Sequence, residues 1–152
     1  MENLHNPLYR LTEHLRSRPE ILLAYLFGSA AEGRTHSLSD LDVAVLVAPE
    51  QFWELDASTP WGYQASLAAE LMGILARNDV DLVLLHSAPP LLAREVVRVG
   101  KLLCCRDEKV RVDFEVRVHQ EYLDTQHLRG IQRSYLYEAA RTGQFGRREA
   151  QT

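Results

Sequence analysis

Two short, nearly continuous apolar runs constrain the fold of this chain more than any other feature. They cover residues 21–27 (ILLAYLF) and 41–47 (LDVAVLV), and a third run follows at residues 80–85. Runs of this length, rich in valine and leucine, are typical of strands that are buried within a sheet. We therefore predict an α/β or α+β domain, with a sheet of about four strands covered by helices.

The segments between these runs carry the signals of helices and loops. Leu8, Leu11 and Leu15 recur at helical spacing and predict an amphipathic helix, which ends before Pro19. The same reasoning predicts helices at residues 7–18, 61–77 and 89–99, a loop at 49–60, and a short fourth strand at 101–105.

The C-terminal third of the chain gives two different signals. Apolar and polar residues alternate from Val110 to Val118, which is typical of a strand. Beyond Tyr122 the apolar residues follow helical spacing instead. The pattern alone therefore predicts a strand followed by a helix.

Length and composition restrict the class of protein. The 152 residues suit one compact domain, and the net charge of -4 argues against a protein that wraps nucleic acid. No apolar run reaches the roughly 18 residues that span a bilayer, and residues 1–10 carry no signal-peptide pattern. We expect a cytoplasmic protein with no membrane contact and no stable nucleic-acid binding.

Aspartates stand at the beginning of two of the predicted strands. Asp40 and Asp42 flank Leu41, and side chains two apart on a strand point to the same side, about 7 Å apart at the backbone. Asp81 has the corresponding position in the next strand, and Asp79 is its competitor. If the two strands are neighbours, the carboxylates meet at one sheet edge and repel each other unless a cation compensates them. Such oxygen ligands favour Mg²⁺ or Mn²⁺.

A glycine turn precedes this acidic pair. Gly28-Ser29 follows the first buried run, and the free N–H groups of a helix start attract phosphate. Gly33 adds a second flexible point, Arg34 could meet a terminal phosphate, and Ser39 directly precedes Asp40. The segment is neither a P-loop nor a dinucleotide fingerprint, because the spacings of both motifs are absent.

The compound motif Gly28-Ser29…Gly33…Ser39-Asp40-Leu41-Asp42, with the later Asp81, resembles the polymerase-β-type nucleotidyltransferase superfamily. Within it the chain is similar to the minimal nucleotidyltransferase (MNT) group. The resemblance implies a mixed sheet flanked by helices. It implies that Gly28, Ser29, Arg34 and Ser39 bind the nucleotide, and that Asp40, Asp42 and Asp81 bind metal and carry catalysis.

The resemblance also implies a reaction and a partner. MNT proteins of this size pair with HEPN-domain toxins, which are ribonucleases, and act as antitoxins by adding AMP from Mg-ATP to a tyrosine of the toxin. We therefore expect ATP as substrate, two Mg²⁺ ions (Mn²⁺ being possible) and a HEPN partner. Two alternatives stay open: a small-molecule, aminoglycoside-like nucleotidyltransferase, and an antitoxin that acts by binding alone.

The same resemblance predicts the secondary structure of the C-terminal third and how the chain is divided. It implies helices from Asp107 to Arg141, and we prefer that prediction to the strand at 110–118. We divide the chain into a nucleotidyltransferase core (1–106) and a C-terminal helical extension of the same domain (107–152).

Side chains outside the motif have simpler interpretations. Trp53 and Trp61 could stack on adenine or on a partner, but we expect them to be buried in the core. Cys104 and Cys105 are expected to be reduced residues at a strand end, and His86 to be structural.

Overall fold

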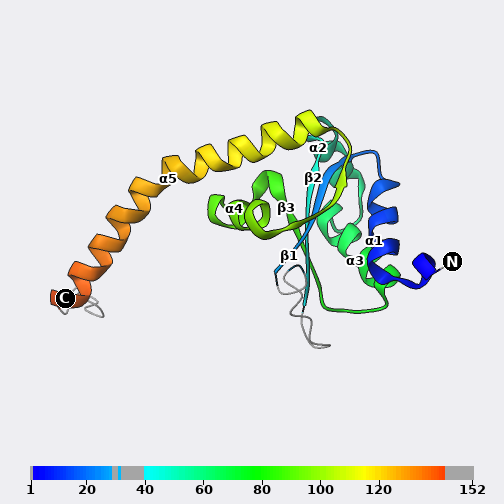
Figure 1. Cartoon of the computed structure of the whole chain (residues 1–152), viewed down its shortest axis with the longest axis horizontal. Coiled ribbons are helices and arrows are strands. Elements are labelled where there is room, and N and C mark those ends of the chain that lie inside the picture. Colours follow the sequence, from blue (N-terminus) through cyan, green and yellow to red (C-terminus); the bar gives the residue numbers. More distant parts are fainter. Residues whose placement is uncertain (1, 29–30, 32–39, 143–152) are drawn as a thin grey trace.

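A four-stranded mixed sheet forms the centre of the molecule, as the computed structural model shows for the described residues 2–28, 31 and 40–142 (Figure 1). The strands are β1 (Ile21–Phe27), β2 (Leu41–Val47), β3 (Val80–Leu84) and β4 (Lys101–Cys105), in the order β3-β2-β1-β4. β2 and β3 are parallel, whereas β1 is antiparallel to both β2 and β4. The four strands predicted before residue 106 and the mixed sheet are confirmed.

Helices cover the sheet and fill the connections. They are α1 (Pro7–Arg16), α2 (Pro49–Ser58), α3 (Tyr63–Leu75), α4 (Pro90–Val99) and α5 (Glu108–Thr142), with 3-10 turns η1 (Glu2–His5) and η3 (Leu85–Ser87). The loop predicted at 49–60 is wrong. Pro49 stands at the first helical position of α2, where its fixed φ favours a helix, and Phe52 turns inward to the core.

The sheet has a hydrophobic core on each face. Leu11, Leu15, Leu67 and Leu71 of α1 and α3 pack on one face (Figure 1). On the other face, a second cluster joins α4 and the first part of α5 through Ala93, Val96, Phe114 and Val118. Since successive strand residues alternate between the faces, each strand supplies side chains to both clusters.

The C-terminal third is one continuous helix, so the strand predicted from alternation is wrong and the helix implied by the resemblance is confirmed. Val110, Phe114 and Val118 are four residues apart and face the sheet. Val112 and Val116 are about half exposed on other sides of the helix. The buried residues of this helix and the two exposed valines between them all fall on even-numbered positions. Together they therefore produce the alternating pattern that is typical of a strand.

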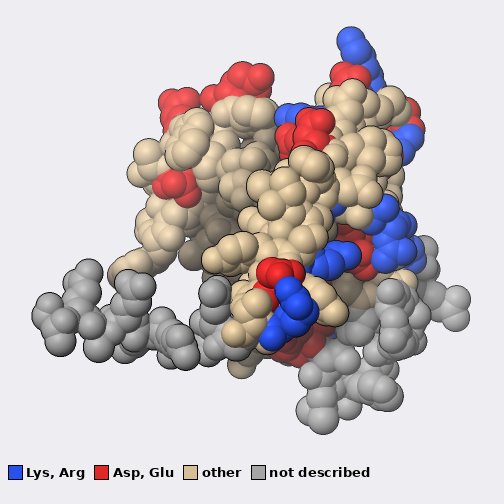
Figure 2. Space-filling model, turned by 90° about the vertical axis from the view of Figure 1, so that its left-hand side faces the viewer, with Lys and Arg blue, Asp and Glu red and all other residues tan. Residues whose placement is uncertain are grey.

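α5 continues well beyond the sheet, as the long arm in Figure 1 shows. Beyond Val118, no residue of the described part of α5 is buried, although apolar side chains such as Leu128, Ile131 and Tyr135 recur along it. Figure 2 shows that basic and acidic groups are interspersed with uncharged surface on the face it presents. None of the helices in the described ranges is long and apolar enough to cross a membrane.

Both tryptophans contradict the prediction of core burial, since Trp53 is 73% and Trp61 95% exposed. Trp53 lies on the outer side of α2 and meets the inward-facing Phe52 edge to face. Trp61 lies in the turn between α2 and α3, where its φ of 66° is in the left-handed region. Cys104 and Cys105 are free thiols at the end of β4, as expected.

A buried carboxylate joins α3 to the chain that enters β1. Glu20 is 7% exposed and accepts hydrogen bonds from the Tyr63 hydroxyl (3.0 Å) and the Arg18 guanidinium (3.1 Å). Burial, together with the neighbouring Glu20 charge, raises the pKa of Tyr63, so its hydroxyl stays neutral and donates. These bonds hold α3 against the end of the sheet opposite Gly28.

Candidate active site

The parallel pairing of β2 and β3 places two acidic residues side by side. Asp42 of β2 is in register with Asp81 of β3. Leu41 and Val43 on β2, like Val80 and Leu82 on β3, point into the core under α1 and α3. The intervening aspartates therefore point to the opposite face of the sheet. Asp40 directly precedes β2 and is exposed.

The electrostatic environment of Asp42 shows that the three carboxylates influence one another. Partial burial raises the pKa of Asp42, and the negative charges of Asp81 and Asp40 raise it further. Three acidic groups thus concentrate negative charge at one end of the sheet. A divalent cation with oxygen ligands would relieve this repulsion, so the donor set fits Mg²⁺ or Mn²⁺.

As their side chains lie in the structure, the carboxylates of Asp40, Asp42 and Asp81 do not form a complete metal site. Within residues 2–28, 31 and 40–142, no three acidic, histidine or cysteine side chains are gathered closely enough to hold one ion. The backbone register fixes where the carboxylates start, and rotation about their side-chain bonds would bring their oxygens together on a cation.

Gly28 lies directly against Asp42. It follows Phe27, whose partner across the antiparallel pair is Asp42, and its φ of 72° is in the left-handed region. A Cβ atom added to Gly28 would lie 2.2 Å from Oδ2 of Asp42, which no real contact allows. Glycine is therefore required here both for the backbone conformation and for the close approach of the carboxylate.

Asp79, the competitor of Asp81, has a different partner. Both of its carboxylate oxygens accept hydrogen bonds from the Arg77 guanidinium, each at 2.5 Å, and this bonding lowers the pKa of Asp79. Its backbone carbonyl accepts a hydrogen bond from the N–H of Leu41 (2.8 Å). Asp79 thus joins the beginnings of β2 and β3, and the geometry favours Asp81 as the third carboxylate.

Three of the predicted nucleotide-binding residues, Ser29, Arg34 and Ser39, lie outside the described residues. Gly33, the second flexible point of the motif, does so as well. Of the predicted nucleotide-binding turn, the structure therefore describes Gly28, which it places beside Asp42.

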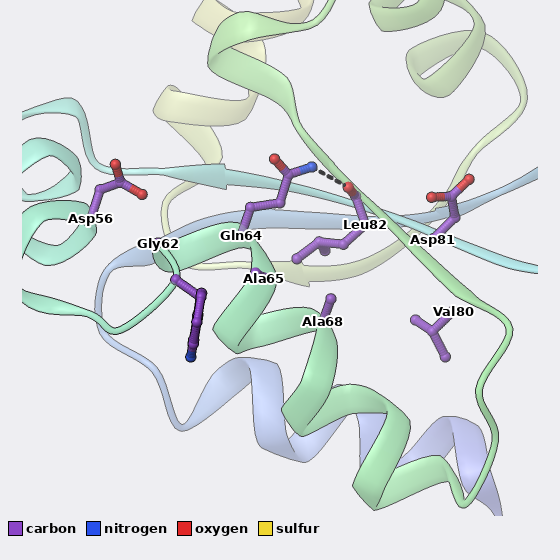
Figure 3. A pocket seen from close by; sticks show the side chains of 9 residues that line it. Asp56, Gly62, Gln64, Ala65, Ala68, Val80, Asp81 and Leu82 are labelled. Carbon is purple, nitrogen blue, oxygen red and sulfur yellow. Dashed lines mark hydrogen bonds between the residues drawn. The ribbon is translucent and has the colours of Figure 1, made fainter.

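A pocket of about 470 Å³ adjoins Asp81 along the open edge of β3. We call it the α3–β3 pocket. It is lined by Asp56, Trp61, Gly62, Gln64, Ala65, Ala68, Val80, Asp81 and Leu82. Figure 3 shows Ala65 and Ala68 on α3 facing β3, and Gln64 reaching Leu82, whose carbonyl accepts a hydrogen bond from Nε2 at 2.7 Å.

Sequence reasoning did not find this pocket. Its members come from the end of α2, the start of α3 and β3, and no short motif links them. The only signal in the sequence was Trp61, which we expected to be buried and which is exposed on the pocket wall.

Comparison with known proteins identifies relatives of this chain. The family described as "Polymerase beta, Nucleotidyltransferase" matches residues 10–109. The protein adenylyltransferase MntA of Shewanella oneidensis is 42% identical over 85 residues, which are 56% of this chain and 55% of that protein. The matched region therefore spans about half the length of that relative.

Solved structures of toxin–antitoxin complexes share the fold. A chain of a toxin–antitoxin complex with AMP-PNP matches with a TM-score of 0.64 and 32% identity, over 88% of this chain and 98% of that one. A chain of the complex between the tri-AMPylated Shewanella oneidensis HEPN toxin and its MNT antitoxin matches with a TM-score of 0.59 and 30% identity, over 92% and 99%.

Proposed function

Because the chain belongs to the polymerase beta nucleotidyltransferase family, we propose that it transfers AMP from Mg-ATP to a hydroxyl group, on a tyrosine of a HEPN-domain toxin. The observation that carries this proposal is the pairing of Asp42 with Asp81 beside Gly28. Nucleotidyl transfer needs a cation site next to a place for the triphosphate, and carboxylates on neighbouring strands next to a glycine turn support both assignments.

Each acidic residue has a role in this proposal. Asp40, Asp42 and Asp81 hold the metal ions, which would neutralise charge on the phosphates when bound. Burial is the largest cause of the raised pKa of Asp42, and the repulsion from Asp81 and Asp40 that adds to it supports this assignment, because a cation would relieve that repulsion. Ser29, Arg34 and Ser39 remain our candidates for binding the nucleotide beside Gly28.

The proposed reaction is an in-line displacement at the α-phosphorus of ATP. The acceptor hydroxyl oxygen forms a bond to that phosphorus while the bond to the bridging oxygen breaks, and pyrophosphate leaves. Asp81 is exposed and lies on β3, which is an edge strand of the sheet. It is therefore the carboxylate best placed to orient the hydroxyl and accept its proton.

The proposed partner follows from the relatives. One match is described as a protein adenylyltransferase, and another comes from a complex that contains an AMPylated HEPN toxin. We propose that this chain has the same kind of partner, that it acts as the antitoxin of the pair and that it does so in the cytoplasm. In this scheme residues 1–106 form the catalytic core and residues 107–152 form its helical extension.

Intact-mass analysis of the HEPN partner, after incubation with the chain, ATP and Mg²⁺, tests the proposal. Each transfer adds one AMP to the mass of the partner. Asp42→Asn and Asp81→Asn should abolish the addition, because each substitution removes a ligand charge and little volume. Asp79→Asn is the matched control and should retain transfer, because Asp79 is paired with Arg77.

Two results would contradict the proposal. One is transfer that persists in Asp42→Asn, which would exclude the aspartate site. The other is a wild-type protein that suppresses the toxin without changing its mass, which would indicate an antitoxin that acts by binding alone.

A further inference from the structure

The last part of α5 is an exposed arm with an apolar face. We call residues 119–142 the arm, because Val118 is the last buried residue in the described part of α5. Leu128, Ile131 and Tyr135 of the arm are each more than half exposed. Helices in proteins gain most of their stability by packing an apolar face, and no described residue of the arm is buried. The arm therefore presents a face that a second molecule can cover.

These three apolar residues lie on the side of α5 that faces the sheet. Val110, near the start of α5, packs against the core beneath the helix. Leu128 follows Val110 by 18 residues and Tyr135 follows it by 25, which are about five and about seven complete helical turns. Ile131 lies three residues after Leu128 and four before Tyr135, so it shares their side. We call Leu128, Ile131 and Tyr135 the arm stripe.

The paired aspartates lie on the same side of the sheet. The core cluster of α4 and α5 covers the face of the sheet opposite α1 and α3. Asp42 and Asp81 point to this face, since their neighbours on β2 and β3 point into the core under α1 and α3. Figure 1 shows the arm bending toward the side of α4. Because long helices bend around what they pack on, a molecule on the concave side of the arm would be on the side of the aspartates.

Contacts to α4 fix the base of the arm. The guanidinium carbon of Arg94, on α4, lies 3.9 Å from the centre of the Tyr122 ring, and that of Arg129 lies 4.2 Å from it. Such cation–π contacts hold α4 and α5 together. Arg129 also donates a hydrogen bond to the carbonyl of Tyr122 (3.1 Å). The arm therefore leaves the domain in a direction that α4 helps to set.

We propose that the arm stripe is a docking surface for the protein that carries the acceptor hydroxyl, the HEPN-domain toxin of the proposed function. The inference rests on that function, because that reaction requires a protein acceptor on the side of the aspartates. The antitoxin chain solved with the tri-AMPylated toxin matches 92% of this chain. The unmatched residues are fewer than those of the arm, so that relative shares at least part of it.

A second copy of this chain is the competing occupant. The arm stripe extends over seven residues, which is about 10 Å of helix at 1.5 Å per residue. Two such stripes packed on each other would bury much less than the roughly 1,000 Å² that a stable interface requires. A globular partner on the concave side can contact the arm and the domain together, so it can bury a larger area.

The test compares matched positions on opposite sides of the arm. Leu123 and Tyr137 follow Val110 by 13 and 27 residues, so they lie about half a turn away from the stripe. Leu128 and Leu123 are 54% and 49% exposed, and Tyr135 and Tyr137 are 73% and 72% exposed. Leu128→Glu and Tyr135→Ala should each weaken binding of the HEPN partner at least about ten-fold, because they remove apolar contacts from an interface. Leu123→Glu and Tyr137→Ala should change it less than two-fold.

Binding is measured by calorimetry on the full chain without ATP, so it does not depend on transfer. Equal effects within each matched pair, or a wild type that does not bind the partner, would overturn the inference. So would a dimer of the chain alone that Leu128→Glu dissociates in sedimentation, because it would assign the stripe to a second copy. If the wild type binds through the stripe but adds no AMP, the proposed function fails and the docking surface stands. If AMP is added but the stripe variants bind like the wild type, the docking surface fails and the proposed function stands.

Discussion

Asp42 lies in surroundings that are unfavourable to its own negative charge. It is partly buried, lies in register with Asp81 and follows Asp40 by two residues. Burial is the largest cause of the raised pKa of Asp42, and the negative charges of Asp81 and Asp40 add to it. In the absence of metal, these carboxylates therefore destabilise the fold, and a bound cation would remove the repulsion between them.

The unfavourable environment of Asp42 predicts how the stability of the fold changes with pH. Folding raises the pKa of Asp42 above its ordinary value of 3.8, so its contribution to stability is full below that pH and is lost as pH rises through the raised pKa. Without metal, Asp42→Asn should be more stable than the wild type at pH 7, by less than about 1 kcal/mol because solvent screens the carboxylates. Urea unfolding between pH 3 and pH 7 would measure this, and a less stable variant at pH 7 would contradict it.

Gly28 gives a second prediction for a single residue. Gly28→Ala places a methyl group 2.2 Å from Oδ2 of Asp42 and forces alanine to a φ of 72°. We expect AMP transfer to fall about 100-fold, because the carboxylate must move, and the free energy of unfolding to fall by about 1 kcal/mol or more.

The control for this substitution is Gly130→Ala. Gly130 lies in the middle of α5, and a Cβ atom there would meet no atom within 4 Å. Because alanine is the better helix former, the control should be more stable by about 0.5 to 1 kcal/mol. Equal losses of transfer in both variants would argue against a special role for Gly28.

Among the elements, α5 shows how the burial of individual residues distinguishes a helix from a strand. Val110, Phe114 and Val118 lie four apart and pack toward the sheet, whereas Val112 and Val116 are exposed by 46% and 50%. A strand would place all five side chains on one face, and a helix separates them.

The two classes of position on α5 should respond differently to truncation. Phe114→Ala should reduce the free energy of unfolding by about 3 kcal/mol, because it leaves a cavity in the core under α4 and α5. Val116→Ala should change it by less than about 0.5 kcal/mol. Chemical denaturation of both variants checks the helical register, and similar losses at the two positions would contradict it.

In the whole molecule, the sheet joins parts of the chain that are far apart in sequence. Asp42 and Asp81 lie on strands separated by α2 and α3, and they meet because β2 and β3 are parallel neighbours. A cation held by both would therefore connect two strands of the central sheet, and its binding energy would add to global stability.

Removal of metal should test this connection. At a Mg²⁺ concentration 100 times the Kd, the wild type should gain about 2.7 kcal/mol of stability, and a chelator should reverse the gain. Asp42→Asn and Asp81→Asn should lose most of it, whereas Asp79→Asn should keep it. Thermal unfolding with and without Mg²⁺ measures the effect, and an equal gain in all four proteins would place the cation elsewhere.

The sequence by itself determined the elements that have strong local patterns. The boundaries of β1 and β2 agree with their apolar runs, because a buried strand needs a nearly continuous apolar segment of that length. The order of glycine turn and aspartate pair was also readable, since both are local in the chain. These features, with the resemblance they support, were sufficient to predict the fold class and the family.

Only the tertiary structure decided what depends on contacts between distant segments. It turned the expected loop at 49–60 into α2, because Phe52 finds the core, and it left Trp61 exposed beside a pocket built from α2, α3 and β3. It also gave Asp79 to Arg77 and placed Asp81 beside Asp42, a choice that depends on strand register. Register and pocket shape are set by packing between elements, so no local pattern in the chain can specify them.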